Sequence, residues 1–249
     1  MPEMTGYENG VPSWVDMGVH DLEAASRFYS ELFGWEIQDL GEEAGHYSMA
    51  SKGGKQVAAL SPAQDPGPPR WTTYVNVDDL DAVAKSAEAS GGTVIVPPMD
   101  VMNAGRMAIF QDTTGAFVAA WQPQEHIGAQ LVNEAGAFIW SELSTSDLEK
   151  SKAFYSDVFG WNWGGADEYA EATVSGRTIA GVMPRRPDMP ADVPDMWLVY
   201  FGPDDVDADT KRAKDLGATI VVEPMDIPGT GRFSVLMDPE SSAFALFKA

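Results

Sequence analysis

The chain of 249 residues carries the same sequence pattern twice, with a spacing of 126 positions. Residues 21–35 read DLEAASRFYSELFGW, and residues 147–161 read DLEKSKAFYSDVFGW. The same spacing relates Trp71 to Trp197, far downstream in each copy. A register held over most of a copy marks an internal repeat. The sequence therefore predicts one structural unit that is duplicated in tandem.

The register slips only in the middle of each copy. Gly54 and Pro62 match Gly176 and Pro184 with a spacing of 122 positions. The second copy recovers the four missing residues in a longer proline-rich linker over residues 185–195. The slip therefore does not break the correspondence of the two copies.

Each copy divides again into two predicted β-α-β-β-β modules. Ser146, Asp78 and Asp204 each stand three residues before an acid, which is the pattern of a helix N-cap. The first copy reads as strand 13–19, helix 21–33, strands to residue 62, a proline-rich break at 63–70, strand 72–77, helix 79–90 and strands to residue 122.

Composition limits the class of protein. The hydrophobic fraction of 44% is that of a globular chain, no apolar run could span a bilayer, and the first residues show no signal-peptide pattern. The absence of cysteine excludes disulfides and thiolate sites, so we expect a cytoplasmic protein. A net charge of −22 argues against nucleic acid as a partner and favours a cationic ligand, although a general need for solubility gives the same charge.

The repeated motif resembles the opening of a vicinal oxygen chelate domain. Asp-Leu-Glu, Phe-Tyr and Phe-Gly-Trp follow the first predicted strand in order, and Gly-Arg with a later Asp at 105–112 and 231–238 resembles the second module. That superfamily includes glyoxalase I, extradiol dioxygenases and bleomycin-resistance proteins. The resemblance implies an α+β fold of four βαβββ modules in two glyoxalase-like domains, residues 11–123 and 136–249. The arrangement is similar to tandem glyoxalase-like proteins of actinobacteria.

The resemblance also implies where a metal ion would bind. In metal-dependent members His, Glu or Gln ligands stand on the first strand of each module and on the last strand of the second. The corresponding positions here are Trp14, Thr72, Ala119, Trp140, Leu198 and Ala245. Among these six positions only Thr72 has a possible donor, its hydroxyl, whereas a divalent transition ion needs three or four donor atoms. None of the histidines replaces them, and His126 falls in the linker. We therefore expect no metal site and no cofactor.

Alternation along the same strands predicts the lining of a pocket. In each copy aromatic side chains share a face with one carboxylate, a set that can stack on a flat ligand and pair with its positive charge. The predicted ligand-binding residues are Trp14, Asp16, Thr72, Tyr74, Asn76, Phe117 and Trp121 in the first copy, and Trp140, Glu142, Tyr200 and Phe247 in the second. The alternative is that both first-strand tryptophans only fill the space of the lost metal.

The two copies differ in polarity at these positions. The second has Leu198 in place of Thr72 and Gly202 in place of Asn76, so we expect the first domain to bind the ligand. Arg106 has an equivalent in Arg232, and both are expected to pair with a carboxylate such as Asp112 or Asp238 for structural reasons.

Three functions are compatible with this pattern. The leading interpretation is a metal-free protein that binds a small molecule, as bleomycin-resistance proteins do. The first alternative is a metal-independent lyase, isomerase or hydroxylase with Asp16 or Glu142 as general base and Tyr74 or Tyr200 nearby. The second alternative is a non-catalytic interaction protein with filled cavities. The duplication predicts a monomer whose halves pack as a pseudo-twofold pair.

Overall fold

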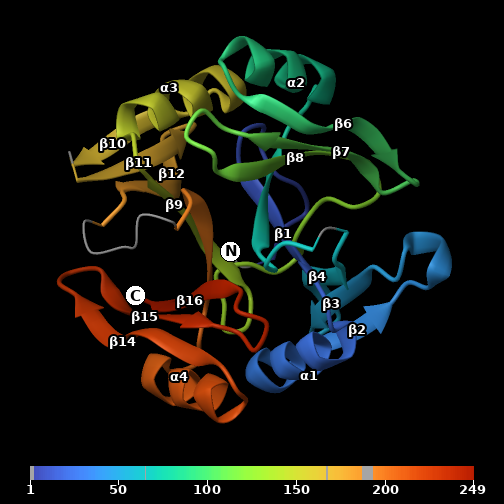
Figure 1. Cartoon of the computed structure of the whole chain (residues 1–249), viewed down its shortest axis with the longest axis vertical. Coiled ribbons are helices and arrows are strands. Elements are labelled where there is room, and N and C mark those ends of the chain that lie inside the picture. The colour runs from blue at the N-terminus through green and yellow to red at the C-terminus, as the bar shows by residue number, and fades with distance from the viewer. Residues whose placement is uncertain (1–2, 65, 167, 187–192) are drawn as a thin grey trace.

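Four βαβββ modules follow one another along the chain, as predicted (Figure 1). The structure is a computed structural model that describes residues 3–64, 66–166, 168–186 and 193–249. Of the predicted linker at 185–195, residues 187–192 lie outside this description.

The first domain contains two modules. The first module consists of β1 (Pro12–Val19), α1 (Leu22–Phe33), β2 (Glu36–Asp39), the 3₁₀ helix Glu42–Ala44, β3 (Ser48–Lys52) and β4 (Lys55–Pro62). The second consists of β5 (Trp71–Asn76), α2 (Leu80–Ala89), β6 (Thr93–Val101), β7 (Gly105–Gln111) and β8 (Phe117–Pro123).

The second domain repeats this order. Its first module consists of β9 (Phe138–Thr145), α3 (Leu148–Phe159), β10 (Asn162–Ala166), β11 (Tyr169–Val174) and β12 (Arg177–Pro184). Its second consists of β13 (Met196–Phe201), α4 (Val206–Asp215), β14 (Thr219–Ile227), β15 (Gly231–Met237) and β16 (Ala243–Lys248).

Each of the four α-helices has an aspartate as its N-cap, and three of these caps lie one residue after the position that the capping pattern predicted. The side chains of Asp21, Asp79, Asp147 and Asp205 each accept a hydrogen bond from the backbone N–H three residues further on. The prediction of Ser146 as a cap was wrong because its hydroxyl donates instead to buried Asp195. The predicted caps Asp78 and Asp204 likewise lie one residue before the true ones.

Each domain forms one eight-stranded mixed sheet. The strand order is β2-β3-β4-β1-β5-β8-β7-β6 in the first domain and β10-β11-β12-β9-β13-β16-β15-β14 in the second. The first strands of the two modules, β1 with β5 and β9 with β13, pair antiparallel at the centre. Residues at the centre of each sheet therefore come from both modules. We call the sheet face turned away from the helices the inner face.

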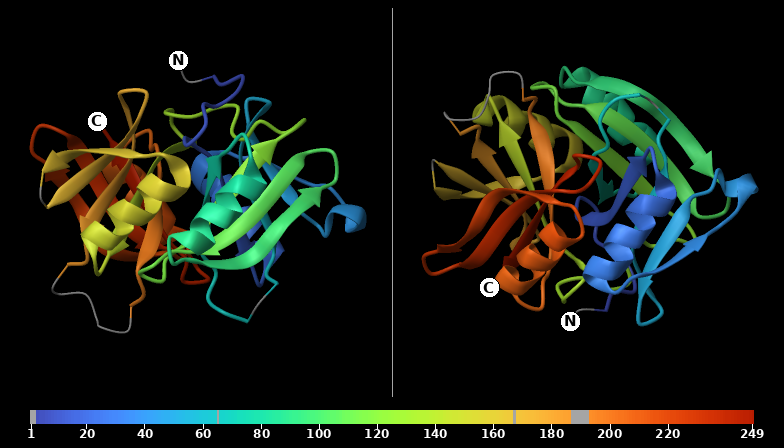
Figure 2. Two further views of the ribbon diagram at one scale, coloured as in Figure 1. Left: turned by 90° about the horizontal axis from the view of Figure 1, so that it is seen from above. Right: turned by 60° about the horizontal axis from the view of Figure 1, so that its bottom comes forward.

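The two domains share their cores. Figure 1 shows α2 beside α3 and α1 beside α4, and the views in Figure 2 show the same pairs. One hydrophobic cluster joins α1 to the second domain, where Phe33 lies 5.0 Å from Phe201 and Phe28 lies 6.2 Å from Phe244, centroid to centroid. A second cluster joins α3 to Val75 of β5 and its neighbours in the first domain. The domains are therefore paired through their helices.

The segments that precede the two first strands also cross between domains. The indole N–H of Trp35 donates to the carbonyl of Gly136, and that of Trp161 donates to the carbonyl of Gly10, both at 2.6 Å. Both glycines have positive φ angles, and a Cβ on either would come within 3 Å of a backbone oxygen of the other domain. Glycine is thus required at each crossing. Among the helices of the described residues, none has the length and hydrophobicity needed to cross a membrane.

Candidate functional site

The positions of the family's metal ligands lie on the inner faces, but their side chains do not fit a metal ion. The Trp14 indole N–H donates to the Tyr47 hydroxyl at 2.9 Å, while Ala119 and Ala245 are fully buried methyl groups. Within the described ranges, no three His, Cys, Asp or Glu residues are grouped so that they could hold an ion. A transition metal would have too few donors here.

A carboxylate held by two tyrosines occupies the first domain instead. Tyr47 and Tyr74 both donate their hydroxyls to Asp16 Oδ2, each at 3.0 Å. With Trp14 bonded to Tyr47, these four residues form what we call the first carboxylate array. The second carboxylate oxygen, Oδ1, accepts no hydrogen bond from the part of the chain that the structure describes. That oxygen can still accept a hydrogen bond.

The surroundings of Asp16 leave its charge uncompensated. Burial raises the pKa of Asp16 to about 6, against the smaller opposing effect of the two tyrosine hydrogen bonds. Burial and the nearby carboxylate also raise the pKa values of Tyr47 and Tyr74 well above their ordinary value, so both hydroxyls stay neutral donors. No lysine or arginine of the described residues pairs with Asp16. At neutral pH the site is an anion that hydroxyl groups alone stabilise, and it favours a cation.

The second domain repeats the arrangement as a second carboxylate array. Tyr200 donates to Glu142 Oε1 at 2.9 Å, the Tyr169 hydroxyl lies close enough to Glu142 to lower its pKa, and the Trp140 indole N–H donates to the Tyr169 hydroxyl at 3.2 Å. Burial is the largest cause that raises the pKa of Glu142. Gly181 admits the Tyr169 side chain, because a Cβ there would lie 2.1 Å from the hydroxyl oxygen.

Sequence reasoning missed the tyrosines Tyr47 and Tyr169. They lie where the register slips, and they match at the spacing of 122 that also relates Gly54 to Gly176. A search for paired polar aromatic residues at that second spacing would have found them. Asp16, Tyr74 and their equivalents at a spacing of 126 were found because β1 and β5 are neighbours in the sheet.

The remaining predicted residues play different parts. Thr72 pairs with Asp16 across the sheet, and Phe117 carries the guanidinium of Arg70 over its ring at 4.7 Å. Asn76 points to the N-terminal segment and donates to the backbone oxygens of Tyr7 and Glu8. Two further predicted residues are occupied by their own neighbours: Trp121 donates to the carbonyl of His126, and Phe247 packs over Gly231.

The two first-strand tryptophans differ in exposure. Trp14 is 3% exposed, so it offers no open stacking face, whereas Trp140 is partly exposed. His126, expected in the linker away from the site, packs edge-on against Trp14 at 4.5 Å. Its Nδ1 bonds with Gln56 and its buried Nε2 has no partner among the described residues. Burial lowers the pKa of His126 to about 4, so it is neutral at pH 7.

The two arginines form structural ion pairs, but with different partners from those predicted. Arg106 binds Asp81 through two hydrogen bonds of 2.8 and 3.1 Å, and Arg232 binds Asp207 in the same way. The predicted partners Asp112 and Asp238 are buried beside the other domain, where they accept hydroxyls from Tyr155 and Tyr29. The arginines therefore tie a β-strand to the start of the neighbouring helix.

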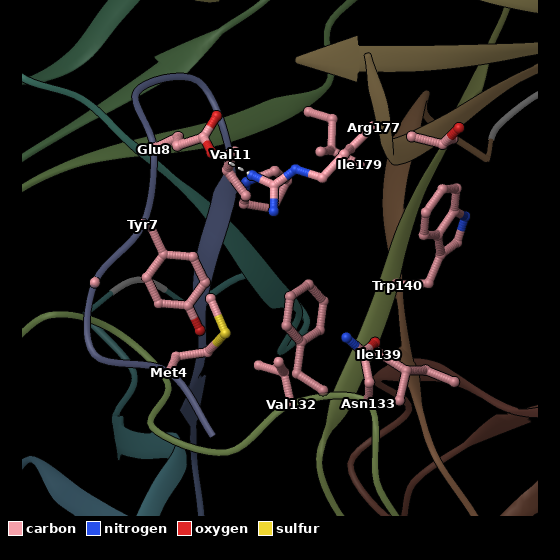
Figure 3. A pocket seen from close by; sticks show the side chains of 14 residues that line it. Met4, Tyr7, Glu8, Val11, Val132, Asn133, Ile139, Trp140, Arg177 and Ile179 are labelled. Atoms are coloured by element: carbon pink, nitrogen blue, oxygen red, sulfur yellow. Dashed lines mark hydrogen bonds and ion pairs between the residues drawn. The ribbon is translucent and has the colours of Figure 1, made fainter. Parts of the chain in front are cut away.

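A pocket of about 450 Å³ opens beside the second carboxylate array (Figure 3). The N-terminal segment, the linker before β9, and strands β9 and β12 surround it. Its lining consists of Met4, Gly6, Tyr7, Glu8, Val11, Pro12, Val132, Asn133, Phe138, Ile139, Trp140, Arg177, Thr178 and Ile179. Trp140 thus belongs both to the array and to the border of the pocket.

Comparison with known proteins agrees with this architecture. CFP32 from Mycobacterium tuberculosis, named as a candidate glyoxylase, is 41% identical over all of this chain and 98% of its own length. The anthracycline biosynthesis protein DauV from Streptomyces sp. strain C5 is 35% identical over 98% of this chain and 94% of its own.

A solved structure shares the fold at low identity. The Mn(II)-bound glyoxalase from Novosphingobium aromaticivorans superposes with a TM-score of 0.68 at 18% identity, covering 99% of this chain and 83% of that one. The model of the Glyoxalase/Bleomycin resistance protein/Dioxygenase superfamily matches residues 12–119 and 137–246. The chain therefore belongs to the glyoxalase/bleomycin resistance protein/dioxygenase superfamily and carries two domains of that family in tandem.

Proposed function

We propose that this protein binds a small organic molecule at its inner faces without the help of a metal ion. The observation that carries the proposal is the pair of carboxylate arrays. In each domain one carboxylate lies against two tyrosine hydroxyls, next to the strand positions where metal-dependent relatives have their ligands. Asp16 keeps one oxygen unbonded by the described residues, which suits a donor group on the ligand.

The electrostatics favour a ligand that carries positive charge. Asp16 and Glu142 lack a cationic partner among the described residues, and the whole chain has a net charge of −22. Such a field concentrates cations near the surface. Relatives named for anthracycline biosynthesis support a ligand of that class, and the partly exposed ring of Trp140 could stack on a flat aromatic molecule. We therefore propose an aromatic ligand with an amine.

The two domains contribute unequally. Buried Trp14 leaves the first array with a carboxylate but no free aromatic face, whereas the second array adjoins a pocket through partly exposed Trp140. Stacking of a flat ligand is thus favoured in the second domain. This assignment replaces the expectation that the first domain binds the ligand, which relied on Thr72 and Asn76 as polar groups.

A metal-independent enzyme is the second candidate. A carboxylate whose pKa lies near neutrality is suited to accept a proton, and burial brings Asp16 to about 6. Asp16 Oδ1 would take the proton from the substrate, while Tyr47 and Tyr74 stabilise the carboxylate through Oδ2. Glu142 and Tyr200 hold the same relation in the second domain. Turnover of a bound ligand distinguishes this candidate from simple binding.

A titration with an anthracycline tests the proposal. The fluorescence of the ligand reports binding, and calorimetry gives the stoichiometry. We expect Glu142→Gln to weaken binding several-fold and Asp16→Asn to remove any second, weaker site. Glu23→Gln is the matched control, because Glu23 is an exposed residue of α1. Unchanged affinity in both array variants, or no binding by any aromatic amine tested, would contradict the proposal.

A further inference from the structure

The pocket beside β9 has a wall that is fixed in place by the fold. The N-terminal arm, residues 3–11, is bonded to the rest of the chain along its length. Met4 N–H donates to the carbonyl of Gln130, and the Tyr7 hydroxyl donates to the carbonyl of Ala129 at 2.6 Å. Asn76 holds the arm from β5. The pocket is therefore a built feature between the two domains.

The floor of this pocket is apolar. Pro12, Val132 and Phe138 are buried beneath it, and Ile139 and Ile179 are partly exposed. Figure 3 shows Met4 and Tyr7 of the arm on one side, with Ile139 and Trp140 of β9 on the other. Such a floor suits the ring of an aromatic molecule, and about 450 Å³ lies within the range of small-molecule sites.

The rim carries one charge of each sign. Glu8 of the arm and Arg177 of β12 are the only charged residues among those that line the pocket. Their ion pair of 2.7 Å closes the upper side of the pocket in Figure 3. Both side chains are more than half exposed, so the pair is weak and can open.

We infer that this pocket binds an aromatic zwitterion, such as an aromatic α-amino acid, by inserting its charged end between Glu8 and Arg177. The ammonium group of the ligand would bind Glu8, its carboxylate would bind Arg177, and its ring would lie on the apolar floor. A zwitterion provides each of the two side chains with a ligand group of opposite charge. A ligand with a single charge would leave one of them without its partner. Asn133 and Thr178 add polar groups at the rim.

The inference is independent of the ligand proposed for the carboxylate arrays. The charged residues involved, Glu8 and Arg177, are not part of either array, and Asp16 and Glu142 do not line the pocket. Trp140 borders both sites, so charge variants separate the two proposals: Asp16→Asn and Glu142→Gln test the arrays, whereas Glu8→Gln and Arg177→Gln test the pocket.

Four indole compounds test the charge requirement. Calorimetry and saturation-transfer NMR with the full chain would compare tryptophan, tryptamine, indole propionate and indole. We expect tryptophan to bind best, because it alone can satisfy both rim charges. Each single charge is expected to add roughly 1.4-fold to fivefold in affinity, as for exposed ion pairs. Equal affinity for all four compounds would overturn the inference.

Charge-neutral variants then locate the site. Glu8→Gln should weaken tryptophan and tryptamine but not indole propionate, and Arg177→Gln should weaken tryptophan and indole propionate but not tryptamine. The matched control is Arg27→Gln, which breaks an exposed ion pair with Glu23 on α1, outside the pocket. Circular dichroism checks that the variants are folded. Unchanged tryptophan affinity in both Glu8→Gln and Arg177→Gln would place any binding elsewhere and refute the assignment.

Discussion

Tyr29 donates its hydroxyl across the domain boundary to Asp238 at 2.8 Å. Tyr155 makes the same bond to Asp112 at 2.9 Å, in the opposite direction between the domains. Both tyrosines are fully buried, and each also receives an indole N–H, from Trp71 and Trp197 respectively. Residues 126 positions apart thus make reciprocal contacts. Reciprocity of this kind is what a twofold interface between identical subunits would have.

Removal of either hydroxyl should destabilise the protein to a similar extent. Tyr29→Phe and Tyr155→Phe each leave a buried carboxylate and a buried indole N–H with one partner fewer. We expect each to lower the free energy of unfolding by about 1–3 kcal/mol, the cost of an unsatisfied buried polar group. Urea unfolding measures the effect. An effect confined to one of the two variants would show that the interface is not equivalent on its two sides.

Separated domains should not remain monomeric. A fragment that ends at Glu125 exposes the surface of α1 that packs on Phe201 and Phe244. We expect this fragment to dimerise or aggregate and the full chain to be a monomer, as measured by size-exclusion chromatography with light scattering. A monomeric fragment that unfolds cooperatively would refute the argument from shared cores.

The fold and part of the site could be read from the sequence because both depend on local pattern. The repeat predicted four modules, and alternation on adjacent strands brought Asp16 and Tyr74 together. The position of His126 beside Trp14 could not be predicted, since the path of a linker depends on tertiary contacts. One such contact is the hydrogen bond from the Trp121 indole N–H to the carbonyl of His126. The burial of Trp14 follows from the same packing, so its exposure was beyond prediction from the strand pattern.

Purified protein should contain no stoichiometric transition metal. The positions equivalent to metal ligands offer a single hydroxyl, that of Thr72, and the neighbouring carboxylate of Asp16 is already bonded by two tyrosines. Elemental analysis of tag-free protein tests this, and a chelator should leave the melting temperature unchanged. One zinc, iron, nickel or manganese ion per chain would show that other residues form a site.

Asp16 and His126 should shift stability with pH in opposite directions. Burial raises the pKa of Asp16 from 3.8 to about 6, so the folded protein binds more protons in that window. Its contribution to stability therefore falls as the pH rises through the window. Burial lowers the pKa of His126 from 6.5 to about 4, so the unfolded chain binds more protons. This contribution is lost as the pH falls from 6.5 to about 4.

The two variants Asp16→Asn and His126→Gln separate these contributions. Between pH 6.5 and pH 4, acidification should destabilise Asp16→Asn more steeply than the wild type, because the stabilising protonation is lost. Acidification should destabilise His126→Gln less than the wild type, because the protonation of Asp16, which stabilises the fold, then has no opposing effect from His126. Urea unfolding over this range gives both slopes, and Glu23→Gln serves as an exposed control. Identical slopes in all four proteins would contradict both pKa shifts.

Replacement of the two array tryptophans should separate stability from binding. Trp14 is 3% exposed and packs against His126, so Trp14→Ala should cost about 3–5 kcal/mol of stability, the usual range for a buried tryptophan. Trp140 is partly exposed, so Trp140→Ala should cost less stability but weaken an aromatic amine by about fivefold, since stacking contributes on the order of 1 kcal/mol.

Trp140→Phe distinguishes stacking from hydrogen bonding in the second array. Phenylalanine keeps an aromatic face but removes the indole N–H that donates to Tyr169. If stacking on Trp140 holds the ligand, Trp140→Phe should retain most of the affinity that Trp140→Ala loses. If the N–H positions Tyr169 and through it Glu142, both variants should lose affinity equally. Ligand fluorescence titration measures the difference, and full affinity in both variants would remove Trp140 from the binding site.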